Sequence, residues 1–332
     1  MKLASVRIGD RDVVAVQVTE DSVIEVGNLL DLAGDESIAT PQTMQELIAA
    51  GDALLFHLET AGREATEDTL NLRAMAPDLW YPPVRRPGKI LGVAMNNSAS
   101  NERKVSAPDH PAFFLKPASC LIGHRDPIRI RPYYGSVHPE PELAVVIGRE
   151  IRDVEPEEAM ESVFGYSIFN DVTSNGMRAE DRFHYWAVYA DEKDPKKTKR
   201  VEQHLSYAAR YKGSDSFGVL GPWLVTRDEI ENPDNLRVQC TVGGETVADD
   251  STRYYNFKVA EVVSFISKFQ TLEAGDVIAL GTAFKPGGSR KSIHHANFQT
   301  VEGPVVVTIE GLGQQENPVV IEDRPLGRWR LA

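Results

Sequence analysis

The chain has 332 residues, of which 42% are hydrophobic and 26% are charged, and its formal net charge is -13. This length and composition predict a soluble globular protein with a substantial core, built as one large domain or two ordinary ones. The acidic surplus argues against a nucleic-acid partner or an anionic membrane surface, because there is no basic excess to replace counterions.

Cysteine content and the N-terminal sequence indicate the compartment. The two cysteines, Cys120 and Cys240, have no paired spacing, which argues against a disulfide framework or a zinc site. Residues 1–8 have the pattern of a first strand and lack the apolar run of a signal peptide. No stretch approaches the length of a membrane span. We therefore expect a cytoplasmic protein without a membrane partner.

Residues 1–80 are expected to form a small N-terminal α/β domain. Strand-like segments at 4–8, 13–18 and 22–25 precede one helical segment at 43–50. Thr43 is a plausible N-cap for that helix, with Glu46 three residues later as in a capping box. The stiff, proline-rich segment 81–88 predicts a boundary with a second domain over residues 89–325.

The second domain is predicted to be rich in β-strands. Short Val- and Ile-rich strands are expected at 89–93, 112–115, 143–147, 237–242, 277–280 and 305–310, with helices at 156–161 and 259–268. Strands and helices do not alternate strictly, so the pattern favours a mixed α+β architecture over a doubly wound sheet. The charged segment 191–200 is interpreted as a solvated loop.

Two glutamates at the start of one predicted strand are the strongest chemical signal. Glu140 and Glu142 are separated by Pro141 and lead into the apolar run 143–147. Because side chains alternate along a strand, both carboxylates should point to the same face, where a hard divalent cation would neutralise their repulsion. The structural alternative is a solvated pair on an edge strand, which the prolines at 139 and 141 also suit.

Three further segments carry candidate site residues. The run 165–171 is a predicted strand that ends in Asn170 and Asp171, although Asn-Asp is also a common turn opener. Lys212 stands in a Gly-rich segment, where a solvated lysine is the default interpretation. Thr282 follows a strand and a glycine, where its hydroxyl would contact a substrate oxygen or cap the local backbone.

Taken together, these segments resemble the fumarylacetoacetate hydrolase family over roughly residues 89–320. The resemblance rests on six blocks in the family's order: FLKP at 114–117, EPELAVVIG at 140–148, GYSIFND at 165–171, the segment from lysine 212 to GPW at 221–223, TLEAGDVIALGT at 271–282 and IEGLG at 309–313. It implies a β-sandwich roll of mixed strands, usually a homodimer, with one Mg²⁺ or Mn²⁺. Family members act on 2-oxo and β-diketo acids through enol or enolate chemistry.

By this resemblance the metal ligands are Glu140, Glu142 and Asp171. Three carboxylates without Cys or His suit a hard cation that keeps positions open for substrate oxygens. Such an ion stabilises the enolate of a chelated 2-oxo acid as a Lewis acid. Lys212 matches the family lysine that supports this negative charge, and Thr282 matches a threonine near the substrate carboxylate.

The chain departs from the family at the residues that activate water. Family hydrolases carry a His and, three residues later, a Glu on a mobile lid, whereas here Ser100 and Arg103 stand at these places. Serine without a neighbouring base is a poor proton acceptor. Glu102, one residue away, is a candidate base if the lid changes register. Asp109, His110 and His184 are further candidates, although a lone histidine is more often structural than catalytic.

Two further departures from the family point to an unusual substrate. The family commonly continues its Asn-Asp with Arg-Asp, whereas this chain continues to Arg178 without that pair, and a basic and aromatic insertion follows at 182–186 that is long enough to cover a site or to make dimer contacts. The family's Gly-Thr-Pro loop is replaced by residues 281–287, in which Phe284 and Lys285 are candidates for contact with a substrate tail. The leading hypothesis is metal-dependent hydrolysis of a C–C bond in a β-diketo or acylpyruvate-type acid. The rival is a decarboxylase, dehydratase or isomerase of a 2-oxo acid, which needs no attacking water. A non-catalytic scaffold is disfavoured because all three carboxylates and Lys212 are present.

Overall fold

A computed structural model describes residues 1–33, 38–284, 293 and 296–327. The N-terminal part contains β1 (Lys2–Ile8), β2 (Arg11–Gln17), β3 (Val23–Glu25), α1 (Val26–Ala33), α2 (Met44–Glu64), α3 (Glu67–Arg73) and β4 (Leu79–Trp80). The central part contains β5 (Ile90–Ala94), β6 (Ala112–Lys116), β7 (Leu121–Ile122), β8 (Ile128–Ile130), β9 (Val137–His138), β10 (Pro141–Ile147), α4 (Pro156–Glu161), β11 (Val163–Asp171), β12 (Thr173–Ser174) and α5 (Asn175–Glu180). There follow β13 (Arg182–Ala190), β14 (Thr198–Ser206), α6 (Ala208–Gly213), β15 (Gly218–Leu220), β16 (Leu224–Thr226), β17 (Arg237–Val242), β18 (Glu245–Ser251), α7 (Val259–Ser267), β19 (Val277–Thr282), β20 (Val305–Ile309), β21 (Gly313–Asn317) and β22 (Val319–Ile321).

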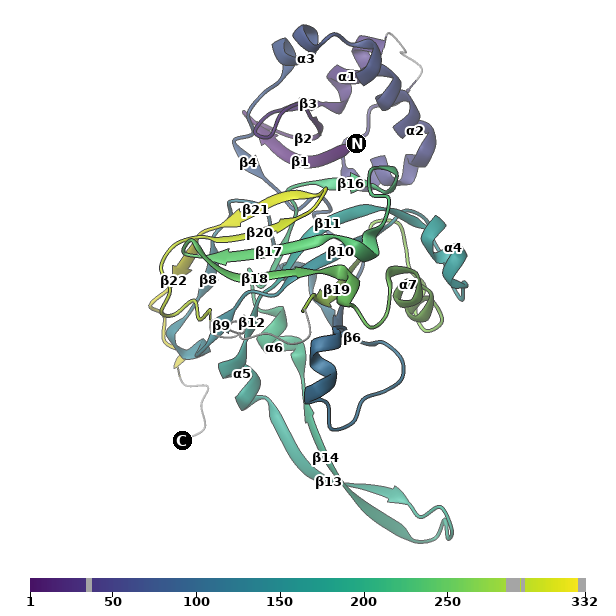
Figure 1. Cartoon of the computed structure of the whole chain (residues 1–332), viewed down its shortest axis with the longest axis vertical. Helices are drawn as coiled ribbons and strands as arrows, with labels where there is room; N and C mark the ends of the chain where they lie inside the picture. Colours follow the sequence, from purple (N-terminus) through teal and green to yellow (C-terminus); the bar gives the residue numbers. More distant parts are fainter. Residues whose placement is uncertain (34–37, 285–292, 294–295, 328–332) are drawn as a thin grey trace.

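Two sheets enclose the main core. The larger sheet has twelve strands, with the order β3-β2-β1-β16-β11-β10-β19-β5-β6 along its main path, and the smaller sheet has the order β18-β17-β20-β21. Apolar side chains of β10 and β11 share one buried cluster with those of β17 and β20. Figure 1 shows the arrangement of these strands. The predicted mixed α+β, strand-dominated fold class is confirmed.

The N-terminal strands continue the large sheet rather than forming a separate one. β1 pairs with β16 through Lys2 and Val225, and a second buried cluster joins α1 and α2 to side chains of β10 and β11. The predicted division at 81–88 into two domains stays a prediction. Thr43 caps α2 as expected, since its hydroxyl accepts the N–H of Glu46 at 3.2 Å. The predicted end of that helix at 50 matches a break at Gly51, beyond which α2 continues.

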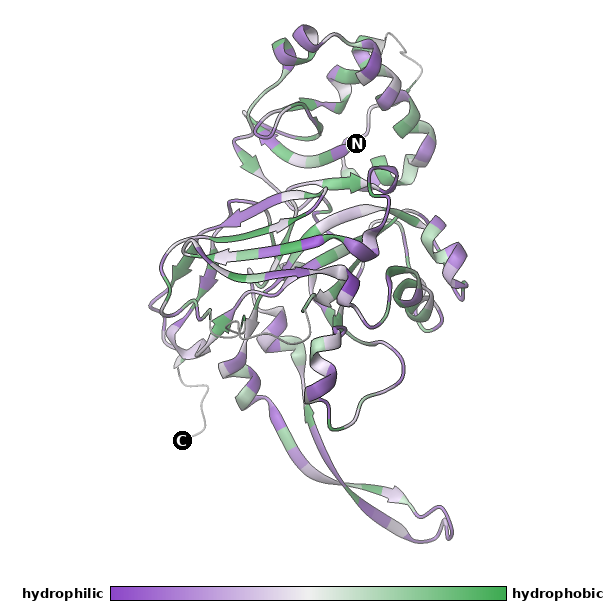
Figure 2. Ribbon diagram, viewed as in Figure 1, coloured by the Kyte–Doolittle hydropathy of each residue, from purple (hydrophilic) through white to green (hydrophobic). Residues whose placement is uncertain are grey.

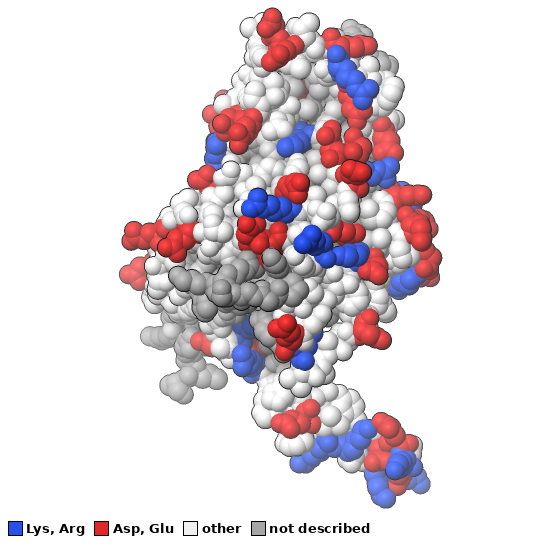
Figure 3. Space-filling model, viewed as in Figure 1, with Lys and Arg blue, Asp and Glu red and all other residues white. Residues whose placement is uncertain are grey.

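One segment differs from its sequence interpretation. The solvated loop expected at 191–200 is shorter, because residues 198–200 belong to β14. β13 and β14 form a two-stranded hairpin that projects from the body (Figure 1). Hydrophobic and hydrophilic residues are interspersed along both of its strands (Figure 2), and charged side chains gather toward its tip (Figure 3). In the described part of the chain, no helix has both the length and the apolarity to cross a membrane.

Candidate metal centre

The predicted carboxylates converge where three central strands meet. β10 runs antiparallel to β11 and to β19, so the start of β10 lies beside the ends of the other two. Glu142 is paired with Phe169 near the end of β11 and with Thr282 at the end of β19, and Asp171 is the last residue of β11. Ligand oxygens of Glu140, Glu142 and Asp171 all lie within 4.8 Å of one another.

Backbone contacts hold both glutamates in place. The N–H of Glu140 donates to Oδ1 of Asn170 at 2.9 Å, which ties the approach to β10 to the end of β11. The N–H of Gly281 donates to Oε2 of Glu142 at 2.9 Å. Gly281 has a φ of +92°, and a Cβ there would lie 2.8 Å from the carbonyl oxygen of Val93, so this position requires glycine. The alternative of a solvated edge pair is wrong, because β10 is central and Glu142 is 2% exposed.

Two lysines neutralise much of the negative charge. Nζ of Lys212, on α6, lies 2.7 Å from Oε2 of Glu140 and 2.5 Å from Oδ2 of Asp171. Nζ of Lys116, at the end of β6, lies 2.5 Å from Oδ1 of Asp171 and also donates to the carbonyl oxygen of Lys212. Sequence reasoning quoted Lys116 in a motif but gave it no role. The available signal was a lysine in an apolar strand, since lysines are almost never fully buried unless paired.

Burial and neighbouring charges separate the two glutamates. Burial alone would raise the pKa of Glu140, but the charge of Lys212 and the hydrogen bond from His138 hold it well below its ordinary value. Burial, followed by repulsion from Asp171 and Glu140, raises the pKa of Glu142 well above its ordinary value. Burial would lower the pKa of Lys212, but the charges of Asp171 and Glu140 raise it instead. The chain alone therefore favours a neutral Glu142 beside a charged Lys212.

These residues fit a hard divalent cation. With every group ionised, three carboxylates and two ammonium groups leave one net negative charge in a buried place. Burial, together with this uncompensated charge, raises the pKa of Glu142. A doubly charged ion would replace the proton on Glu142 and leave the centre with one positive charge, which attracts an anionic substrate. The donor set is all oxygen, which suits magnesium or manganese.

A pocket of about 240 Å³ opens onto the two glutamates and Lys212. Its other walls come from residues far apart in sequence: Met95, Ser100, Phe114, Arg178, Tyr211 and Phe284. Thr282 also lines the pocket, and its hydroxyl lies 3.4 Å from Oε2 of Glu140 and 3.5 Å from Oε1 of Glu142. Lys285, which was expected to contact a substrate tail, lies outside the described residues.

The predicted catalytic bases are more scattered than the ligands. Ser100 borders the pocket, but its hydroxyl lies 2.6 Å from the carbonyl oxygen of Asn97, a hydrogen bond that occupies its proton. Glu102 is exposed on the same turn and is not among the described residues that line the pocket. Asp109 and His110 are exposed and also lie outside that lining, with the His110 ring stacked on Phe265.

His184 is placed on the projecting hairpin. Its Nε2 lies 2.5 Å from Oε1 of Glu202, and it is not among the described residues that line the pocket. Arg178, which sequence reasoning noted only as a departure from the family, lies at the pocket on α5, with its guanidinium carbon 5.9 Å from the ring centroid of Tyr211. Arg178 could therefore be noted in the sequence, but its place at the pocket could not be predicted.

The sheet topology and the carboxylate centre together define a strand-dominated fold with a candidate site for a divalent metal. The profile described as "Fumarylacetoacetate (FAA) hydrolase C-terminal" matches residues 89–320, and the chain belongs to this family. The predicted family and its fold are thereby confirmed.

Several curated relatives are tautomerases. The mitochondrial oxaloacetate tautomerase fahd2 of Xenopus laevis is 32% identical over 89% of this chain and 83% of its own length. The human protein FAHD2A, with the same description, is 31% identical over 84% of this chain and 80% of its own length.

Solved structures share the fold over nearly the whole chain. A 5-carboxymethyl-2-hydroxymuconate delta-isomerase from Mycobacterium smegmatis has a TM-score of 0.64 at 25% identity, covering 98% of this chain and 100% of its own. A maleylpyruvate hydrolase from Sphingobium sp. SYK-6, in complex with manganese and pyruvate, has a TM-score of 0.68 at 24% identity, covering 97% of this chain and 100% of its own. Isomerases and hydrolases thus share one architecture.

Proposed function

We propose that this protein is a divalent-metal-dependent tautomerase that interconverts the enol and keto forms of a 2-oxo dicarboxylic acid such as oxaloacetate. The observation that carries the proposal is a pocket with groups to stabilise an enolate and, among its described lining residues, no histidine and no glutamate beyond the two proposed ligands. Tautomerisation removes the proton from the enol oxygen and adds one to the neighbouring carbon, with solvent as proton acceptor and donor, so no water is consumed and no water-activating base is needed. The tautomerases among the relatives that are more than 30% identical support the same choice.

The proposed roles follow from position and charge. Glu140, Glu142 and Asp171 hold Mg²⁺ or Mn²⁺, which when bound supplies positive charge that favours the enolate over the ketone. Lys212 keeps its proton at neutral pH, because its pKa is raised by the surrounding carboxylates. It therefore donates a hydrogen bond to the developing enolate oxygen rather than acting as a base. Thr282 orients the substrate carboxylate through its hydroxyl.

Arg178 supports a substrate with a second carboxylate. It is the arginine among the described residues that line the pocket, and guanidinium groups bind carboxylates through two parallel hydrogen bonds. Arg178→Lys should therefore raise KM for oxaloacetate more than kcat changes. For the enol of a monocarboxylic 2-oxo acid, the same substitution should leave KM nearly unchanged. Equal effects on both substrates would argue against this role.

The direct test follows the enol form of oxaloacetate by its ultraviolet absorbance in the presence of Mg²⁺ or Mn²⁺. Because metal ions alone promote enolisation, Glu142→Gln with the same metal is the control. Faster decay with the native chain than with the variant supports the proposal, and equal rates contradict it. Mass spectrometry of the same mixtures detects loss of CO₂ or of water, which would instead indicate a decarboxylase or a dehydratase.

Hydrolysis of an acylpyruvate is the second candidate. It is favoured by the turn at Ser98–Arg103, because Ser100 lines the pocket and Glu102 lies two residues further on the same turn. A shift of this turn would bring a carboxylate to the place where a water-activating base is needed. Glu102→Gln should then lower hydrolysis by roughly 10²–10⁴-fold, the usual contribution of a general base. The tautomerase proposal expects no such loss.

The proposed assembly is a homodimer. The projecting hairpin exposes large hydrophobic side chains on both faces: Phe183, Tyr185, Trp186, Val188, Tyr189 and Val201. The family resemblance implies a homodimer, and a second copy of the chain is the occupant that we propose for this surface. Light scattering of the purified chain tests the assembly. A monomer at micromolar concentration would contradict it.

A further inference from the structure

The projecting hairpin carries a second group of side chains that lie close together. It contains two histidines and one glutamate, whereas the carboxylate centre contains three carboxylates. His184 on β13 is paired directly with His204 on β14, and Glu202 precedes His204 by two residues. Because strand side chains alternate, all three stand on one face of the hairpin. Their potential ligand atoms all lie within 4.8 Å of one another.

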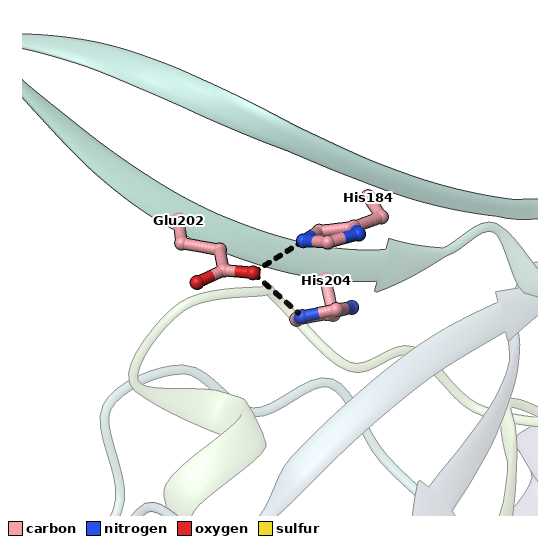
Figure 4. A group of neighbouring side chains, drawn as sticks. All are labelled: His184, Glu202 and His204. Atoms are coloured by element: carbon pink, nitrogen blue, oxygen red, sulfur yellow. Dashed lines mark hydrogen bonds and ion pairs between the residues drawn. The ribbon is translucent and has the colours of Figure 1, made fainter.

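The three side chains point to one place (Figure 4). Nε2 of His184 lies 2.5 Å from Oε1 of Glu202, and Nε2 of His204 lies 3.7 Å from the same oxygen. The two imidazole rings are stacked, with centroids 4.0 Å apart and an interplanar angle of 15°. The in-plane lone pairs of the two Nε2 atoms therefore run nearly parallel, and zinc binding requires one imidazole to turn toward the other. Ligands of a tetrahedral zinc ion with bonds of about 2.0–2.1 Å are roughly 3.3 Å apart, and the two observed distances lie on either side of that value.

We propose that His184, Glu202 and His204 form a transition-metal site that binds Zn²⁺ and clamps the two strands of the hairpin together. Two imidazoles and one carboxylate are a recurrent zinc ligand set, with the fourth position left to water or another ligand. Imidazole donors select borderline metals such as zinc, whereas the all-oxygen carboxylate centre suits magnesium or manganese. The chain would then hold two metals of different chemistry.

A metal at this site would stabilise the isolated hairpin. Among the described strands, β13 and β14 pair only with each other, over nine residue pairs, and two-stranded hairpins are marginally stable alone. A metal held by one residue of β13 and two of β14 would cross-link the strands near the end of the hairpin that joins α5 and α6. It would thereby fix the direction in which the exposed aromatic side chains project.

The first experiment counts zinc on the full-length chain, prepared without a histidine tag and freed of metal. Zn²⁺ is titrated against a chromophoric chelator for the native chain and for His184→Asn, His204→Asn and Glu202→Gln. Each variant should bind one zinc fewer per chain, or should lose more affinity for that zinc than the roughly 10–100-fold that is typical when an outer-sphere partner is removed. His57→Asn, which removes a histidine from α2, should keep the native stoichiometry.

Two controls make the count decisive. Mn²⁺ binding at the carboxylate centre should be equal in the native chain and in all hairpin variants, which shows that the variants are folded. Glu142→Gln should lose binding at the carboxylate centre and keep the zinc that the histidines hold. Equal zinc binding by the native chain and His204→Asn would overturn the site, as would the absence of any zinc that depends on His184.

The second experiment tests the clamp. Amide hydrogen exchange over residues 182–206 is measured with and without Zn²⁺, using the metal alone as the probe. Zinc should slow exchange in this segment of the native chain and leave it unchanged in His204→Asn. If zinc binds with the expected stoichiometry but does not slow exchange, the binding site stands and its clamping role is refuted.

Discussion

The described part of the molecule contains two clusters of three potential metal ligands, and both are assembled by the register of antiparallel strands. The carboxylate centre lies inside the large sheet, where Glu142 and Asp171 are almost fully buried. The hairpin cluster lies in solvent, where the side chains of His184 and Glu202 are 59% and 50% exposed. Similar strand geometry therefore produces two very different electrostatic environments.

Burial decides what each cluster must do with its charge. In the sheet, the charges of Lys116 and Lys212 only partly compensate the three carboxylates, and the pKa of Glu142 rises well above its ordinary value. On the hairpin, water screens the carboxylate of Glu202 and no comparable compensation is required. The negative charge of the buried centre thus favours binding of a cation, whereas metal binding at the exposed cluster depends on the affinity of imidazole for particular metals.

The largest expected effect comes from removing one buried ligand. Glu142→Gln should lower metal-dependent turnover by on the order of 10²-fold or more, because the ion loses both a ligand and a charge. It should also abolish the stabilisation that Mn²⁺ gives the native chain, which is about 2.7 kcal/mol at 100 times Kd and is measured as a rise in thermal midpoint. Zinc binding at the hairpin should be unaffected. Native turnover in this variant would contradict the assignment of the carboxylate centre.

The next effect separates the two lysines of the buried centre. Lys212→Met should lower kcat by about 10²–10³-fold, the range for loss of one preorganised donor, while Mn²⁺ still binds. Lys116→Met is the matched variant, because Lys116 bonds the same carboxylate of Asp171 but is not among the described residues that line the pocket. It should act mainly on the free energy of unfolding, measured in urea. Equal kcat losses in both variants would remove the distinction.

The buried centre could be predicted from sequence to a large extent. The i, i+2 spacing of Glu140 and Glu142 before an apolar run, and Asp171 at the end of another, are local patterns that strand periodicity converts into a shared location. The family resemblance supplied the grouping of these three carboxylates as one set of ligands. Lys116 shows the limit: its charge partner is 55 residues away, and only the fold brings the two together.

The hairpin cluster could not be predicted from sequence in the same way. His184 was noted as a lone candidate, whereas Glu202 and His204 drew no attention. The start of the connecting turn determines which residue of β14 faces His184. The charged segment 191–200 gives no signal of where that turn begins. A shift of one residue would have moved His204 to the opposite face of the hairpin.

A smaller effect concerns pH and belongs to the buried centre alone. Glu142 holds a proton to a higher pH than an ordinary glutamate, so binding of Mn²⁺ must release that proton. Apparent affinity should therefore rise with pH by up to about tenfold per unit below the raised pKa, and level off above it. Calorimetry in buffers of different ionisation enthalpy measures the released proton. Glu142→Gln should lose this dependence, and a flat profile above the ordinary glutamate pKa would refute the raised value.

The smallest effect tests whether exposure leaves the hairpin cluster energetically independent when no metal is bound. In a chelator, Glu202→Gln should change the free energy of unfolding by less than about 1 kcal/mol, as for other solvent-exposed ion pairs. Under the same conditions Glu142→Gln should stabilise the chain at neutral pH. Folding then no longer requires a carboxylate that is ionised in the unfolded chain to be buried and protonated, and the amide oxygen still accepts from Gly281. Urea unfolding measures both changes. A loss of several kcal/mol in Glu202→Gln would mean that the hairpin carboxylate is coupled to the fold as strongly as the buried ones, and the contrast between the two clusters would fail.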